Sequence, residues 1–411
     1  MSLATRVLVG LVCGGLLGLA LAGSGSPTVT TAIGAFAAIG GLFVDLIRMC
    51  AMPLVAALVV ASLGRAAGAG AGRAGVRAAA LAVAVLAAVT AASLLVAHPL
   101  LAGVAPDPGA IAAAADRAAA APAAPPGFWQ WVRDLVPQNV AKAASDGAML
   151  PVIVFSVLFG LAVARSTPPR RDAVLGVAEG VAEAMQHLVS GILRLAPIGV
   201  FALAVPLTAR TGLSAAGAVV TYIAVVVGLT AVAIAALYPL VAALGRMPMR
   251  TFAACCGPAQ ALAVASRSSL ATLPVLVEAA ERARFEPTAA RVVLPLAVSV
   301  FHVGTAVAQT VGVLFLARLA GVALGPVDLA TVGVAVVVAS SAVPGIPGGS
   351  IIAIVPVLAA ARVPLEGIGL LLAVDTIPDM VRTVANVTGA FALAAMTRTA
   401  GDAGDPRTPV D

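Results

Sequence analysis

The chain has 411 residues, of which 61% are hydrophobic and only 10% are charged, and its mean hydropathy is +1.09. Because soluble domains carry about 25% charged residues, this composition excludes an ordinary soluble protein and indicates a polytopic membrane protein. The net charge of +6 does not indicate nucleic-acid binding, because the arginines gather in short connections on one predicted side of the membrane. This positive-inside pattern predicts that both termini lie in the cytoplasm.

Apolar runs of the roughly 20 residues that cross a bilayer follow one another along the chain. Residues 104–146, by contrast, are rich in alanine and proline and contain Trp129 and Trp131, which predicts an outer loop with tryptophans at the membrane interface. Residues 399–411 are expected to form a short cytoplasmic tail. The eight predicted full-length spans lie at about 4–22, 30–63, 76–103, 147–165, 175–208, 215–243, 288–318 and 365–397.

Two further apolar runs are interrupted by residues that a straight lipid-facing helix does not tolerate. The run from Phe252 to Val277 contains a Ser-Arg-Ser-Ser sequence over 266–269, and the run from Val332 to Ala360 contains a Pro/Gly stretch over 344–350. Non-helical backbone at membrane depth occurs where it is buried in protein or lines a cavity, so both runs predict re-entrant hairpins, over about 252–283 and 332–362. We therefore expect an all-α polytopic membrane protein with eight transmembrane helices plus two re-entrant helical hairpins.

Inside the last apolar run, five polar residues form one stripe. Counted from the first of them, they stand at positions 0, 4, 7, 8 and 11, which share one face of an α-helix. An unpaired charge at membrane depth costs about 3 kcal/mol or more, so a function is expected for this stripe, and holding a charged solute fits it. The five residues are Asp375, Asp379, Arg382, Thr383 and Asn386.

Motifs along nearly the whole chain resemble one family of membrane carriers. Residues 267–274 and 345–348 resemble the tips of the two hairpins of this family, and the segment from Asp379 to Gly389 resembles its eighth span. Residues 42–55, 149–160 and 195–203 are similar to its second, fourth and fifth spans. The ordered set resembles the dicarboxylate/amino acid:cation symporters, which have the glutamate/aspartate transporter fold.

The resemblance implies a homotrimer in which each subunit carries solute by an elevator movement. Residues 1–75 and 147–208 would form a scaffold of helices 1, 2, 4 and 5. Residues 76–103 and 215–398, which hold helices 3, 6, 7 and 8 with both hairpins, would form the moving transport unit.

The resemblance also implies a role for the polar stripe and for the hairpin tips. Arg382 matches the residue that holds a side-chain carboxylate of the solute, and Asp379 matches the residue that pairs with its amino group. Two alternatives stay open: an ion pair of Arg382 with Asp375, and a role of Asp379 in neutralising Arg382. The other implied solute-binding residues are Ser268, Ser269, Thr305, Ile346, Ser350, Thr383 and Asn386, and the implied lid hinge is Gly345, Pro347, Gly348 and Gly349.

The chain departs from the family where sodium is expected to bind. The family has Asn-Met-Asp-Gly-Thr in its seventh span, whereas this chain has Phe-His-Val-Gly-Thr over 301–305, and Ala390 stands where an aspartate is usual. Phe301, Val303 and Ala390 are therefore degenerate sodium positions, since apolar side chains offer no hard oxygen ligand. His302 and Asp375 are candidates for coupling, although a neutral histidine bonded within the bundle explains His302 equally well. Pro378 is expected to kink the helix just before Asp379.

These observations predict a symporter for an acidic amino acid or C4-dicarboxylate in a bacterial inner membrane. A proton-coupled or uncoupled carrier is one alternative, and a non-transporting anion channel or sensor is another. We expect no cofactor, a coupling ion that is H+ or Na+, a small acidic solute and the lipid bilayer as partners, and no nucleic acid. An enzyme is not expected, because no nucleophile–base pair or metal-ligand cluster stands out.

Overall fold

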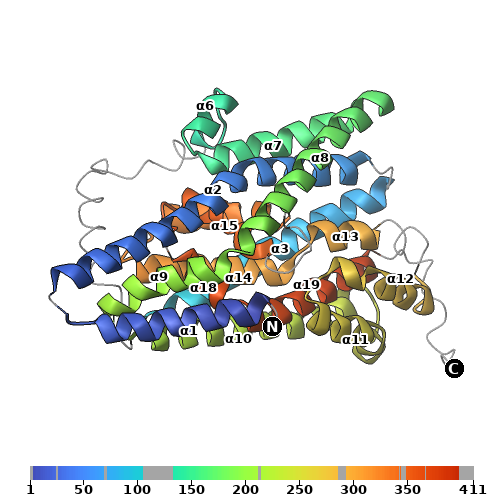
Figure 1. The fold of residues 1–411 in the computed structure, drawn as a ribbon. Helices are drawn as coiled ribbons and strands as arrows, with labels where there is room; N and C mark the ends of the chain where they lie inside the picture. The colour runs from blue at the N-terminus through green and yellow to red at the C-terminus, as the bar shows by residue number, and fades with distance from the viewer. Residues whose placement is uncertain are drawn as a thin grey trace.

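The computed structural model describes residues 3–24, 26–68, 72–104, 133–211, 214–285, 293–341, 343, 349–365 and 367–397. Every regular element within these ranges is a helix (Figure 1). The predicted all-α class is therefore confirmed. Most of the predicted outer loop lies outside the described residues, and its described end carries the short helix α6 (Val140–Ser145).

A first group of helices packs around α2 and α9. It consists of α1 (Leu3–Leu21), α2 (Pro27–Gly68), α7 (Met149–Ala164), α8 (Pro168–Leu193) and α9 (Ala196–Thr211). Helix α1 lies very close to α9, because Gly10, Gly14 and Gly18 present one face without side chains. A Cβ at Gly10 would stand 2.4 Å from the carbonyl oxygen of Pro197, so this small-residue face allows the two backbones to approach.

A second group surrounds α14, in which every residue except Arg318 is buried. Helix α14 contacts α3, α10, α15 and α19, so its low polarity reflects its central place in the core. Helix α19 in turn packs on α10, α11 and α13. The group consists of α3 (Gly72–Leu100), α10 (Ser214–Leu244), α11 (Met249–Ser266), α12 (Leu273–Arg282), α13 (Leu294–Val300), α14 (Val303–Leu319), α15 (Pro326–Ser340), α16 (Gly349–Ile352), α17 (Val355–Ala360), α18 (Ile368–Val374) and α19 (Thr376–Met396).

Each of the two interrupted runs contains a pair of helices that contact each other, while their re-entrance into a membrane stays a prediction. Helices α11 and α12 contact each other across a turn that begins at Arg267, whose φ of 51° ends α11 in the left-handed region. Figure 1 shows this pair at one end of the molecule, with α11 beside α19. Helices α15 and α17 also contact each other, whereas Gly345, Ile346, Pro347 and Gly348 at the predicted second tip lie outside the described residues.

The described helices differ in how they meet the requirement for crossing a membrane. Four are long and apolar enough, within Pro27–Arg65, Arg77–Leu100, Gly217–Leu244 and Leu294–Leu319. The run predicted at 175–208 is a broken one, in which α8 and α9 meet at an angle of 59°, and this pair counts as a fifth. The full count of eight spans stays a prediction.

Candidate functional site

The polar stripe begins at a break between two helices. Helix α18 ends at Val374 and α19 begins at Thr376, with Asp375 between them. Pro378 has no backbone N–H to donate to the carbonyl of Val374, and its ring crowds that carbonyl, which explains why the helix is interrupted one turn earlier. The N–H of Asp379 still donates to the carbonyl of Asp375 at 2.7 Å, so the stripe stays in register across the break.

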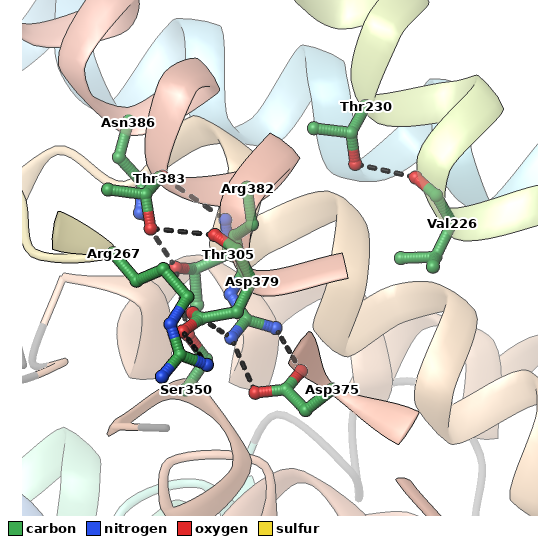
Figure 2. Close-up of polar contacts among 10 residues, drawn as sticks. All are labelled: Val226, Thr230, Arg267, Thr305, Ser350, Asp375, Asp379, Arg382, Thr383 and Asn386. Carbon is green, nitrogen blue, oxygen red and sulfur yellow. Dashed lines mark hydrogen bonds and ion pairs between the residues drawn. The ribbon is translucent and has the colours of Figure 1, made fainter. Parts of the chain in front are cut away.

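Arg382 holds both carboxylates of the stripe (Figure 2). Its Nη1 donates to Oδ1 of Asp375 at 2.9 Å and its Nη2 donates to Oδ2 at 3.0 Å, which is the two-pronged geometry that a guanidinium offers a carboxylate. Nη2 also donates to Oδ1 of Asp379. Arg382 is only 2% exposed. The ion pairs foreseen by both alternatives are therefore present, and a solute-binding role for Arg382 stays a prediction.

A second arginine reaches the stripe from the turn between α11 and α12. Nη1 of Arg267 lies 3.8 Å from Oδ2 of Asp379, and the Arg267 side chain is 27% exposed. That carboxylate oxygen is buried and accepts no hydrogen bond among the described residues. The charges of the cluster sum to zero, because two arginines and two aspartates form it: Arg267, Arg382, Asp375 and Asp379. The site thus offers one unsatisfied acceptor within a neutral cluster.

The two serines of the predicted first tip occupy the same turn as Arg267. Oγ of Ser268 accepts from the N–H of Ala271 at 3.3 Å, and the carbonyl of Ser269 accepts from the Thr272 hydroxyl at 2.6 Å. Ser269 is buried and Ser268 is half-buried. These bonds fix the turn that aims Arg267 at Asp379, while direct contact of the serines with a solute stays a prediction.

Further along α19, Asn386 ties the stripe to the start of α14. Its amide oxygen accepts from the N–H of Gly304 at 2.8 Å and of Thr305 at 3.2 Å, and its amide nitrogen donates to the Thr305 hydroxyl at 3.2 Å. That hydroxyl lies 3.4 Å from Oγ of Ser350 in α16, just after the second tip. A Cβ at Gly304 would stand 2.3 Å from the carbonyl of Arg382, so glycine is required for α14 to start here.

The structure thus brings seven of the predicted residues into one buried region. Thr383 also belongs there, and its hydroxyl donates to the Asp379 carbonyl at 2.7 Å. Gly349 begins α16 next to Ser350. The members of the buried region are Thr305, Ser350, Asp375, Asp379, Arg382, Thr383 and Asn386 (Figure 2).

The degenerate sodium positions also converge, but as an apolar contact. Phe301, Val303 and Ala390 are all fully buried. A Cβ at Gly389 would stand 2.9 Å from Cγ2 of Val303 and 3.3 Å from Cε1 of Phe301, which places both side chains beside the turn that carries Ala390. No group of three or more His, Cys, Asp or Glu side chains able to hold a metal ion occurs among the described residues. The side chains present here do not fit a sodium ion, which binds through oxygen.

His302 lies in the unwound step between α13 and α14. Its Nδ1 is 2.9 Å from the carbonyl of Ser340, at the end of α15. Because a carbonyl only accepts hydrogen bonds, Nδ1 carries the hydrogen. The buried Nε2 is then an acceptor, and it has no hydrogen-bond partner among the described residues. This bond connects the start of α14 with the arm that leads to the second tip.

Gln309 is a buried polar residue that sequence reasoning passed over. Neither its amide oxygen nor its amide nitrogen has a partner among the described residues. It stands one helical turn after Thr305 on α14, where the other polar residues are only Thr305, Thr310 and the terminal Arg318, so this single amide was the available signal. Thr90 on α3, a helix that contacts α14, has a buried hydroxyl without a partner as well.

These features define a polytopic membrane protein with a charged site enclosed by its own helices. The sequence profile of the Sodium:dicarboxylate symporter family matches residues 3–400, so the chain belongs to this family. The resemblance noted from the motifs is thereby confirmed over nearly the whole chain.

Curated relatives are named for transport of acidic solutes. The chain is 31% identical to the "Proton/sodium-glutamate symport protein" of Bacillus subtilis (strain 168), over 62% of this chain and 59% of the relative. It is 28% identical to the "Proton/glutamate-aspartate symporter" of Escherichia coli (strain K12), over 64% of this chain and 60% of the relative. It is 27% identical to "C4-dicarboxylate transport protein 1" of Pseudomonas aeruginosa (strain UCBPP-PA14), over 62% and 57%.

The chain therefore spans less than two thirds of the length of these relatives in each match. Two of these relatives are named for symport and the third for transport, and none is named as an enzyme, in agreement with the expectation from the sequence.

Proposed function

We propose that this chain is a secondary carrier that moves an acidic amino acid or C4-dicarboxylate across the bacterial inner membrane. The observation that supports this most directly is the buried guanidinium of Arg382, held between Asp375 and Asp379. A buried ion pair is weak evidence for stability, because desolvation offsets most of its attraction. A binding function explains its presence better, and relatives named for glutamate and C4-dicarboxylate transport point to the same class of solute.

In this proposal, the solute competes with Asp375 for Arg382. A solute carboxylate has the same two oxygens as Asp375 and fits the same face of the guanidinium. Oδ2 of Asp379, which accepts no hydrogen bond among the described residues, accepts from a solute ammonium group, which favours an amino acid over a plain dicarboxylate. The solute is further enclosed by the second tip and by four polar side chains, those of Ser268, Ser269, Thr383 and Asn386.

The charges of the site call for one monovalent cation, and the side chains at the degenerate sodium positions favour a proton over sodium. An amino acid with two carboxylates and one ammonium adds a net charge of −1 to a cluster whose charges sum to zero. One proton restores neutrality, and Asp375 is the carboxylate that the solute sets free. The apolar contact of Phe301 and Val303 beside Ala390 gives sodium no side-chain ligand. A carrier without ion coupling is the second candidate, since the empty site is already neutral.

The quaternary and dynamic parts of the proposal follow the family resemblance. The α1–α2 and α7–α9 group would form the scaffold of a homotrimer, and the group around α14 would move against it. The tip that contains Gly345, Pro347 and Gly348 would open and close over the solute. Both termini would lie in the cytoplasm.

Uptake of labelled aspartate, glutamate and succinate into proteoliposomes tests this function. Sodium and proton gradients are imposed separately, with an ionophore control for each. We expect accumulation of an amino acid under an inward proton gradient, with one proton per solute and without sodium. Strong sodium-driven accumulation would overturn the coupling argument. Absence of uptake for all three acids under every gradient would overturn the proposed function itself.

A further inference from the structure

The amide of Gln309 lies on the face of α14 that is turned toward the polar stripe. Thr305, one helical turn earlier, accepts through its hydroxyl from the Asn386 amide of the stripe. Gly312, three residues later, meets the helix before the stripe, since a Cβ there would stand 3.3 Å from Cδ1 of Leu371 in α18. Residues spaced by four and seven positions share one face of an α-helix. Gln309 therefore lies on the same side as Thr305 and Gly312.

Asp375 stands at the same level on the facing side. Helix α14 runs opposite to α18 and α19, because its start lies against Arg382 and its later residue Gly312 lies against Leu371. From Gly312 back to Gln309 the rise along α14 is about 4.5 Å. From Leu371 on to Asp375 the rise along α18 is about 6 Å in the same direction. The side chains of Gln309 and Asp375 thus start from nearly the same height on facing helices.

Both ends of the Gln309 amide require a partner that the described residues do not supply in this state. The side chain is only 1% exposed, and neither its oxygen nor its nitrogen has a hydrogen-bond partner among the described residues. A buried amide without partners is costly, so it indicates a group that binds in another state. A carboxylate only accepts hydrogen bonds, whereas a protonated carboxyl group both donates and accepts. A protonated Asp375 therefore fits both ends of the amide.

We propose that Gln309 receives the carboxyl group of Asp375 when a solute displaces it from Arg382. This inference rests on the proposed function, in which one proton binds with each solute. The proton forms an O–H bond on Asp375, and this hydrogen is donated to Oε1 of Gln309 while Nε2 donates to the other carboxyl oxygen. The proton returns to water on the side where the solute is released, so none is consumed. Gln309 is thus a positioning residue that holds the protonated form away from Arg382.

The neighbours of Asp375 show why an amide is needed. Four charged or titratable side chains act on it electrostatically: Arg382 and Asp379 of α19, Arg267 of the turn after α11, and Tyr222 of α10. The two arginines only donate hydrogen bonds, so they favour the charged carboxylate. A phenol has one polar atom, whereas an amide has a separate donor and acceptor that match the two oxygens of a protonated carboxyl group.

Isothermal titration calorimetry of aspartate binding to the detergent-purified full chain tests the proposal. Measurements in buffers of different ionisation enthalpy count the protons that are taken up with the solute. We expect about one proton per aspartate for the wild type, as proton-linked binding requires. Gln309→Met keeps the length of the side chain and removes the amide. It should weaken aspartate binding about tenfold, the value of two hydrogen bonds, and should suppress most of the proton uptake.

Thermal unfolding of the solute-free protein separates this role from a structural one. Gln309→Met removes a buried amide without a partner among the described residues, so the midpoint should rise by about 2 °C. Gln260→Met is the matched control. Gln260 donates to the Tyr238 hydroxyl at 3.1 Å and to the Thr388 hydroxyl at 2.8 Å, so its replacement should lower the midpoint and leave proton uptake unchanged.

The possible outcomes distinguish this inference from the proposed function. Wild-type affinity and proton uptake in Gln309→Met would overturn the inference, and so would a lower midpoint, because the amide would then have a partner in the solute-free protein. Weaker binding with unchanged proton uptake would mean that Gln309 contacts the solute itself, which also overturns it. Loss of proton uptake in Tyr222→Phe but not in Gln309→Met would assign the role to the phenol. A wild type that binds no acidic solute would overturn the proposed function.

Discussion

The polar side chains in the first half of α19 are buried like the apolar ones in its second half, but the two halves are chemically opposite. The first half, with Asp379, Arg382 and Asn386, carries charges and amides that reach α14 and the turn after α11. The second half carries Ala390 and Phe391, whose ring lies 5.6 Å from Phe252 and 5.1 Å from Phe285. In the proposed function the first half recognises a charged group, whereas the second half is core packing.

Under the proposed function, this contrast indicates which part of a symporter's chemistry the side chains of α19 support. A buried charge is tolerated when its partners are fixed, and the first half supplies them within the same helix. In the second half, Val303 and Phe301 fill the space beside Ala390, so no charge requires compensation there. We infer that the residues for solute recognition and the positions where the family binds sodium lie on the same helix, about two turns apart.

The largest effect is expected from Arg382→Ala. This change leaves Asp375 and Asp379 buried without their shared cation, and breaking such a pair costs about 3–5 kcal/mol. Uptake of aspartate into proteoliposomes should fall more than about 100-fold, since each 1.4 kcal/mol is a factor of ten. Arg382→Lys keeps the charge but not the planar fork and should recover only part of the activity. Wild-type uptake in Arg382→Ala would show that the first half of α19 does not bind the solute.

The second test converts the apolar half into a charged one. Ala390→Asp buries a carboxylate beside Phe301 and Val303, so we expect the protein to lose about 3 kcal/mol of stability without a cation. Sodium should raise the thermal midpoint of this variant more than potassium does, and it should have no specific effect on the wild type. Ala390→Asn, which has the same size without the charge, is the control. A wild type that sodium already stabilises would contradict the contrast between the two halves.

A smaller effect is expected from Asp379→Asn, which concerns the kind of solute. Asparagine keeps the size of the side chain and removes the charge that attracts an ammonium group. Because a hydrogen bond to a charged group contributes about 1.5–3 kcal/mol, the preference for aspartate over succinate should fall roughly tenfold or more. Competition between the two labelled solutes measures this ratio directly. An unchanged ratio would mean that Asp379 only neutralises Arg382 and Arg267 and does not contact the solute.

The smallest effect is expected from His302. Glutamine in this position can still donate to the Ser340 carbonyl, so His302→Gln should keep proton-driven uptake. His302→Ala removes the bond and should lower stability by about 1 kcal/mol. Uptake at a series of pH values and thermal unfolding in detergent measure the two quantities. If His302→Gln abolished proton-driven accumulation but kept downhill uptake, His302 and not Asp375 would carry the proton.

Much of the site was predictable because one helix contains most of it. The spacing of Asp375, Asp379, Arg382 and Asn386 places them on one face whatever the rest of the chain does. The broken runs around Arg267 and after Ser340 were readable because polar and Pro/Gly residues interrupt apolar sequence. The break of the last span was likewise predictable from Pro378, whose ring and missing N–H act locally.

Contacts between distant segments were not predictable in the same way. Nothing in the sequence states that Arg267 reaches Asp379, that His302 meets the end of α15, or that Gln309 finds no partner in the part of the chain that the structure describes. Residue type gave candidates, whereas the choice among partners depends on how α11, α14, α15 and α19 pack. The 59° bend between α8 and α9 was not located in advance either, although Arg194, which stands between the two helices, and Pro197 interrupt the apolar run at 175–208.

The sequence by itself determined the membrane class, the family and the charged face of the last helix, because these depend on composition and on spacing along one chain segment. Only the tertiary structure decided that Arg382 is held by its own carboxylates, that Phe301 and Val303 close the space beside Ala390, and that the amide on α14 faces the charged stripe. These properties depend on distances across the bundle, and such distances are set by packing of many side chains at once.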